Sequence, residues 1–351
     1  MAYTDIDDPS AYFQTFTYTG NQSSRQITLD GNSDLQPDLY WYKARNANHH
    51  YWVDSSRGTT KYIYSSLANA EATVASAYVT SFNTNGFGVG GGDSGTNANG
   101  ISFGNWAWKA NGGTTTAFSE SGNNPGGTYQ ANTTAGFSIV TYTGTGAAGT
   151  VTHGLGVAPK LIIIKNRDVA DPWAVLPPDR NDLYLVLNTT VGWAASSAFW
   201  NDTAPSSTVF TVNTDHSVNA DGEAYVAYCF VEKQGYSKFG KYVGNGNADG
   251  TFVYTGFKPA LVMFKVLSDP NYGWSMIDNT RSPSNLMNDD LYANSSAAEV
   301  TDANKCDFLS NGFKLRGSTY PANSGGGNEY AYFAWAENPF TTSTGIPTTA
   351  R

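Results

Sequence analysis

The sequence has few charged side chains, few cysteines and no cluster of basic residues. Only 14% of its 351 residues are Asp, Glu, Lys or Arg. Average proteins have about 25%, so a coiled coil, a salt-bridged helical bundle and a charged disordered tail are excluded. The 20 Lys and Arg residues against 29 Asp and Glu give a net charge of −9, with no basic run. Nucleic acid is therefore not a predicted partner.

Long apolar segments are also missing. The most apolar runs, 161–164 and 225–231, are far shorter than the roughly 20 residues that span a bilayer. Residues 1–9 have neither the basic nor the apolar region of a secretory signal, so we expect no membrane insertion and no such signal. Cys229 and Cys306 lie beside aromatic residues, and we interpret them as small buried hydrophobic residues rather than a disulfide.

The residues that are abundant favour strands and turns. Aromatic residues make up 14% of the chain, and there are 37 glycines. Residues 137–142 alternate between apolar and polar, as in a strand with one buried face. The apolar runs 39–42, 161–164 and 261–264 do not alternate, which predicts central strands covered on both faces.

An internal repeat organises the chain. In three places a proline is followed by four bulky apolar residues and a lysine: 37–43, 159–165 and 259–265. A tryptophan follows each lysine by eight or nine residues, at Trp52, Trp173 and Trp274. The first and third copies also have the sequence Asp-x-x-Arg, at Asp54 with Arg57 and at Asp278 with Arg281.

We therefore predict an all-β protein of three tandem β-sandwich domains, each built from a repeat of about 100 residues. The predicted domains are 1–110, 137–233 and 234–340. Residues 111–136, rich in Gly, Asn and Thr, are expected to form a linker or a long surface loop. Residues 341–351 are expected to be a polar tail that is mobile or bound by a partner.

Six segments carry a family resemblance: 137–144, 153–165, 225–230, 255–260, 307–316 and 333–340. They resemble a domain of unknown function that is found in tail-fibre and other virion proteins of tailed bacteriophages, particularly those of marine bacteria. The resemblance implies a component of the phage particle, assembled in the host cytoplasm and bound to other virion proteins. It assigns no catalytic residue. By analogy with phage fibres and spikes, we expect a homotrimer.

No motif indicates an enzyme, a metal or another cofactor. The four histidines are not spaced as zinc ligands, and the nucleophile-elbow, Walker and dinucleotide motifs are absent. The oxygen-rich segment 245–250 has one carboxylate and is better explained as a hairpin turn than as a calcium loop. Carboxylates from distant loops could still form a glycan depolymerase, although no spacing selects a pair.

The candidate site residues fall into three groups. The Asp54/Arg57 and Asp278/Arg281 pairs are interpreted mainly as charge-assisted hydrogen bonds that fix loops. Because they recur, the three tryptophans that follow the lysines are assigned to the core. Aromatic residues outside the repeat are the candidates for contact with a bacterial surface glycan or a partner protein. They are Tyr51, Trp193, Trp200, Tyr272 and Tyr320.

Three functions follow in order of preference. The first is a tail fibre or spike component of the virion surface that adheres to the host. The second is a head decoration protein or tail adaptor without receptor contact. The third is the glycan depolymerase.

Overall fold

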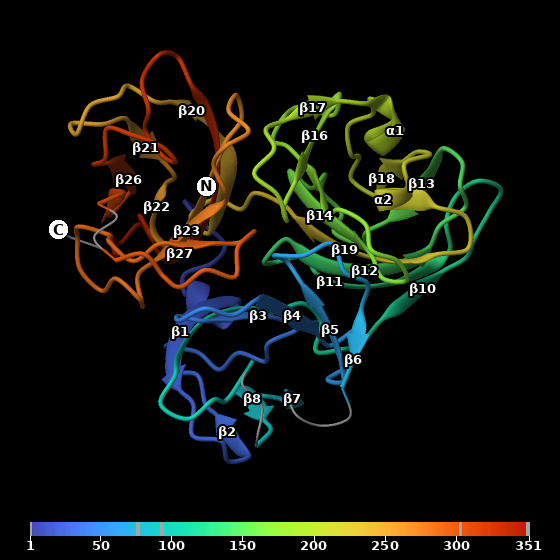
Figure 1. The fold of residues 1–351 in the computed structure, drawn as a ribbon, viewed down its shortest axis with the longest axis horizontal. Helices are drawn as coiled ribbons and strands as arrows, with labels where there is room; N and C mark the ends of the chain where they lie inside the picture. The colour runs from blue at the N-terminus through green and yellow to red at the C-terminus, as the bar shows by residue number, and fades with distance from the viewer. Residues whose placement is uncertain (1, 75–77, 92–94, 302–303, 349–351) are drawn as a thin grey trace.

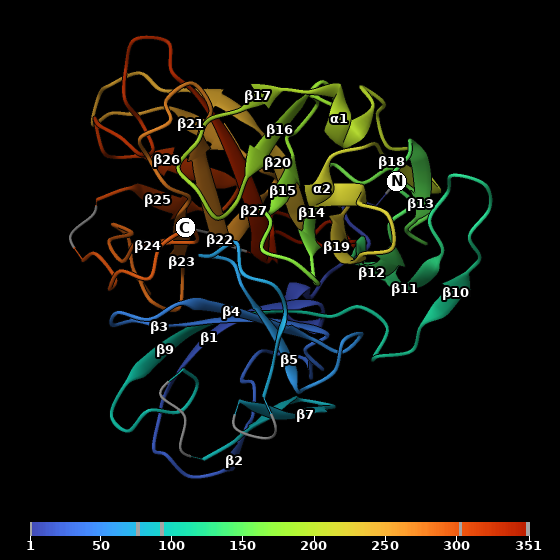
Figure 2. The same cartoon turned by 45° about the vertical axis from the view of Figure 1, so that its right-hand side comes forward.

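Antiparallel strands make up almost all of the regular secondary structure. The computed structural model describes residues 2–74, 78–91, 95–301 and 304–348. Within these ranges, only short helices accompany the strands: η1 (Pro9–Ala11), α1 (Ser197–Trp200) and α2 (His216–Asn219). Figures 1 and 2 show the strands gathered into three groups around a common centre. We call these groups lobe 1 (β1 to β9), lobe 2 (β10 to β19) and lobe 3 (β20 to β27).

Each lobe contains one large sheet. In lobe 1 its order is β1 (Phe13–Thr19), β9 (Ser102–Trp108), β3 (Leu39–Ala44), β4 (His50–Asp54), β5 (Lys61–Tyr64) and β6 (Ala72–Thr73). In lobe 2 it is β10 (Thr116–Phe118), β11 (Gly127–Asn132), β12 (Phe137–Thr143), β19 (Ala224–Phe230), β14 (Leu161–Asn166), β15 (Ala174–Leu176), β16 (Leu183–Val186) and β17 (Ala194–Ala195). In lobe 3 it is β20 (Ser237–Val243), β27 (Glu329–Pro339), β22 (Phe257–Val266), β23 (Ser275–Asp278) and β24 (Leu291–Tyr292).

A smaller sheet forms a second layer over each large one. These sheets are β2 (Arg25–Ile27), β8 (Gly86–Val89) and β7 (Val79–Asn83) in lobe 1; β13 (Gly149–Thr152) and β18 (Val209–Val212) in lobe 2; and β21 (Phe252–Tyr254), β26 (Gly312–Leu315) and β25 (Cys306–Leu309) in lobe 3. Each small sheet shares a hydrophobic cluster with its own large sheet. Cys229 and Cys306 lie buried and unbridged in two of these clusters, as predicted.

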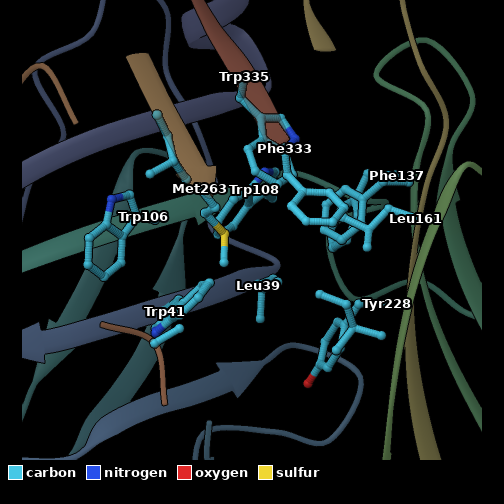
Figure 3. Packing of buried hydrophobic residues seen from close by; sticks show 14 of the residues in the cluster. Leu39, Trp41, Trp106, Trp108, Phe137, Leu161, Tyr228, Met263, Phe333 and Trp335 are labelled. Carbon is cyan, nitrogen blue, oxygen red and sulfur yellow. The ribbon is translucent and has the colours of Figure 1, made fainter. Parts of the chain in front are cut away.

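The central strand of each large sheet is buried on both faces, which confirms the prediction from the apolar runs. In β3, Tyr40 and Tyr42 contact the small sheet's cluster, whereas Leu39 and Trp41 point the other way. The same alternation holds in β14 and β22. The outward faces of all three large sheets meet in one shared core, where Figure 3 shows Trp41, Tyr228 and Met263 converging. Hydrophobic burial thus holds the lobes together as well as each lobe by itself.

Two expectations about the arrangement of the strands were wrong. The segment 111–136 is not simply a loop, because β10 and β11 within it extend the large sheet of lobe 2 alongside β12. The three tryptophans are buried, but they are not equivalent. The last apolar residue before the lysine is Ile164 in lobe 2 and Phe264 in lobe 3. The residues that pair with these two are immediately preceded by Trp173 and Trp274. The matching residue in lobe 1 is His50, because Tyr51 pairs with Tyr42.

Candidate functional site

The Asp-x-x-Arg pairs lie at the junctions between lobes. At the junction of lobes 1 and 2, the Arg57 guanidinium is 2.5 Å from the Asp54 carboxylate, and both side chains are fully buried. Arg57 also contacts Glu71 at 3.0 Å, and Glu71 accepts two hydrogen bonds from Arg167 of lobe 2. Tyr228 of lobe 2 donates a 2.7 Å hydrogen bond to Asp54. This network joins the two lobes by charge-assisted hydrogen bonds.

The pKa shifts at this junction follow from burial and charge. Burial alone would lower the pKa of Arg57, but the charges of Asp54 and Glu71 outweigh it and raise this pKa. Burial alone would raise the pKa of Glu71, but the hydrogen bond from Arg167 and the charge of Arg57 lower it. Arg57 and Glu71 are therefore held in their charged forms.

The junction of lobes 3 and 1 repeats the network with different residues. Arg281 is 2.5 Å from Asp278 and 2.8 Å from Glu299. Glu299 accepts a 2.6 Å hydrogen bond from Arg45 of lobe 1. The indole N–H of Trp106, also of lobe 1, donates to Asp278 at 3.0 Å, as Tyr228 donates to Asp54. Each Asp-x-x-Arg pair thus connects two lobes in addition to fixing a local loop.

The junction of lobes 2 and 3 has a different chemistry. At each of the other two junctions, the backbone N–H of the glutamate donates to the carbonyl of an arginine in the neighbouring lobe. Glu71 donates to Arg167 at 2.8 Å, and Glu299 donates to Arg45 at 2.8 Å. The matching bond runs from the Trp193 N–H to the Leu267 carbonyl at 3.2 Å. A tryptophan therefore takes the place of the acidic residue. Arg180 lies 5.1 Å from the centre of its ring, a cation–π contact in place of an ion pair.

A buried lysine lies at the end of each central strand. Lys43, Lys165 and Lys265 are fully buried, and their ammonium groups donate to backbone carbonyl groups. Burial lowers the pKa of each to about 8. Lys265 donates to Thr190 of lobe 2 at 2.8 Å, so this lysine also fixes a junction.

The aromatic candidates divide into buried and partly exposed residues. Tyr51 and Trp200 are buried in the small-sheet clusters of lobes 1 and 2, so the expectation that they are surface residues is wrong. Tyr51 lies in β4, a strand that is buried throughout, and stacks on Tyr42. Trp193 is partly exposed. In addition to the Arg180 contact, the Lys241 ammonium of lobe 3 lies 5.3 Å from the centre of its ring.

Lobe 3 has the most accessible aromatic surface. Tyr272 and Tyr320 are partly exposed and stack at 4.0 Å with their rings 13° apart. Sequence reasoning missed Phe252 and Tyr254 of β21, which are 42% and 47% exposed. The alternation of 252–254, in which Val253 is buried, could have revealed them, because it places both rings on one outer face.

Of grooves, metal sites and membrane-spanning helices, the described part of the chain contains only grooves. A polar groove of about 740 Å³ lies in lobe 3 between Lys258, Asn285 and Phe308. Among the described residues, no group of three or more His, Cys, Asp or Glu side chains is placed to hold a metal ion. None of the helices described is long and apolar enough to span a membrane.

Three two-layer β lobes closed into a ring around one core, with a polar network at two of the three junctions, define the structural class of this protein. The chain belongs to the family described as Domain of unknown function (DUF7483), whose model matches residues 8–339. This match spans all three large sheets. Neither a curated protein nor a solved structure matches the chain.

Proposed function

We propose that the chain consists of three tandem β-sandwich domains, derived from a repeat of about 100 residues, and that it is a structural protein on the surface of a tailed phage particle. The shared strand order supports the repeat: first strand, last strand, central strand and hairpin occur in that order in each large sheet. The resemblance of the repeated segments to virion proteins supports the location.

Adhesion to the host is the preferred role, through the aromatic surface of lobe 3. The observation that carries this proposal is the exposure of Phe252 and Tyr254 on one strand, with the Lys238 ammonium 5.7 Å from the Tyr254 ring. Flat exposed rings beside polar groups are suited to stacking on sugars. The junction carboxylates are occupied by buried arginines, so they are not available as a catalytic pair, and we propose binding rather than catalysis.

The proposed adhesion can be tested by competition. Purified protein should reduce phage adsorption to host cells, and the Phe252→Ser/Tyr254→Ser variant should compete much less well. Val157→Ser in lobe 2 is the matched control, since Val157 is also exposed but lies in another lobe. If saturating wild-type protein does not compete, the adhesive role is wrong.

An architectural role is the second candidate, as a head decoration protein or tail adaptor. Closure of the ring within one chain favours it, because a ring of three similar lobes fits a partner with three-fold symmetry. A homotrimer of whole chains would have to use surfaces outside the filled junctions. Imaging of virions at subnanometre resolution would distinguish the roles: density on capsomers would exclude simple receptor binding.

A further inference from the structure

The three lobes differ in how they close the outer edge of their large sheet. The first strand of the repeat in lobe 2 is β12, which is not at the edge because β11 pairs with it along 137–142. The first strand of lobe 1 is β1 and that of lobe 3 is β20, and in the sheet order each has a neighbour on one side only. An edge strand with unpaired backbone groups is a template for another strand.

In lobe 2 the hairpin of β10 and β11 covers the outer side of β12. The N–H of Thr143 donates to Gly126 at 3.1 Å. The side chain of Thr128 meets that of Thr141 at 2.9 Å. The hairpin also reaches the small sheet, where the N–H of Thr150 donates to the Asn124 side chain at 2.8 Å. One segment thus covers both layers.

In lobe 3 the edge is closed by local groups. The Phe239 N–H donates to the Glu232 carboxylate at 2.8 Å, and the Ser237 N–H donates to the Lys233 carbonyl at 2.9 Å. The Val243 carbonyl accepts a 2.9 Å bond from Thr251. Lys241 lies on this strand and is exposed, and a charged residue on an edge discourages pairing.

In lobe 1 the edge is open. The Gly20 N–H donates to Ile101 at 2.8 Å, and Tyr12 accepts from Lys109 at 2.9 Å. Even-numbered residues of β1 therefore bond to β9, and the backbone groups of the odd-numbered Thr15 and Thr17 point outward. Within the described part of the chain, no strand pairs with β1 on that side.

The open edge borders a groove. The groove has a volume of about 390 Å³ and lies between β1 and β2, lined by residues that include Thr15, Thr17, Gln26, Asp30 and Thr280. At the C-terminal end of β1, the Arg25 guanidinium donates to the Thr19 carbonyl. Strand β1 itself has no charged residue, in contrast to β20.

We propose that β1 binds an extended segment of a partner protein as an added antiparallel strand, as β12 binds β11. The partner strand has uncharged side chains, like those of 126–132, and a glycine at the close approach. A Cβ atom on Gly127 would lie 2.0 Å from the Thr141 carbonyl, and Thr17 occupies the same place in β1. Backbone hydrogen bonds supply affinity in this mode of recognition. The proposal goes beyond the proposed function and holds for any particle to which the chain belongs.

The test uses the full chain and a labelled peptide, Gly-Gly-Thr-Tyr-Gln-Ala-Asn, which is the sequence of 126–132. We expect the peptide to bind and to shift the NMR signals of the Thr15 and Thr17 amides. Thr17→Pro removes an outward N–H that the fold does not use, and it should weaken binding about tenfold or more. Thr17→Val keeps the N–H and should bind like the wild type.

Two results would overturn the proposal. One is the absence of binding at millimolar peptide, and the other is binding that Thr17→Pro leaves unchanged. If the proline variant does not fold, Thr17→Lys replaces it, because the Thr17 side chain is exposed and a lysine there places a charge on the edge. Hydrogen exchange of the free protein is an independent check: the Thr17 amide should exchange much faster than that of Thr141, and equal protection would refute the open edge.

Discussion

Removal of Asp54 should destabilise the protein far more than removal of Asp182. Each aspartate forms an ion pair with the arginine at the same position in its lobe, which is Arg57 in lobe 1 and Arg180 in lobe 2. In Asp54→Ala the Arg57 guanidinium stays fully buried without its nearest carboxylate. The Tyr228 hydroxyl also loses its acceptor. Breaking a buried ion pair by removing one partner costs about 3 to 5 kcal/mol, since the remaining charge is uncompensated. Glu71 still contacts Arg57 at 3.0 Å, so we expect the lower end of this range.

Asp182→Ala is the matched control. Asp182 and Arg180 are 2.7 Å apart, but their side chains are 50% and 38% exposed, so water screens the pair. An exposed pair of this kind contributes much less than a buried one, because water screens it. Urea unfolding of both variants, followed by tryptophan fluorescence, measures the two losses. If Asp54→Ala loses less than about 1 kcal/mol, or no more than Asp182→Ala, the buried network does not stabilise the junction.

Further predictions concern four other buried groups. Because burial lowers the pKa of Lys165 to about 8 and its unfolded value is about 10.4, the unfolded chain binds more protons between these values. The free energy of unfolding should therefore rise from pH 8 toward pH 10, and Lys165→Met should reduce the rise. Above about pH 10 it should fall, since burial raises the pKa of Tyr330 to about 12. Trp173→Phe removes a donor to the Tyr64 carbonyl, and unfolding should show a loss of about 1 to 3 kcal/mol. Burial raises the pKa of the Cys229 thiol, so a thiol reagent should label it only after denaturant is added.

Short-range patterns in the sequence predicted the strands well. The apolar run 161–164 has no polar alternation because β14 packs on its own lobe with Ile162 and on the shared core with Ile163. The run therefore reported burial on both faces. It could not predict that the second face packs against the two other lobes, because any apolar surface would select the same residues.

Spacing failed where hairpins differ in length. Counting from the lysine assigned Trp52 to the place of Trp173, but the residue at that place in lobe 1 is His50. The chain between paired residues of a hairpin can change by a residue or two while the register of the strands is kept. The same limit applies to Tyr51, which has polar neighbours in the sequence and lies in a strand that is buried throughout.

Three lobes in one chain can differ where three identical subunits cannot. In a symmetric trimer, each junction and each sheet edge would be the same. Here two junctions hold a buried glutamate between arginines, and the third holds Trp193. The edges differ in the same way: β12 is paired with β11, β20 carries Lys241, and β1 is open. A partner strand that recognises β1 would consequently bind once to each ring. If the proposed peptide site exists, its stoichiometry in calorimetry is one peptide per chain, and a value of two or three would mean that the other edges are also accessible.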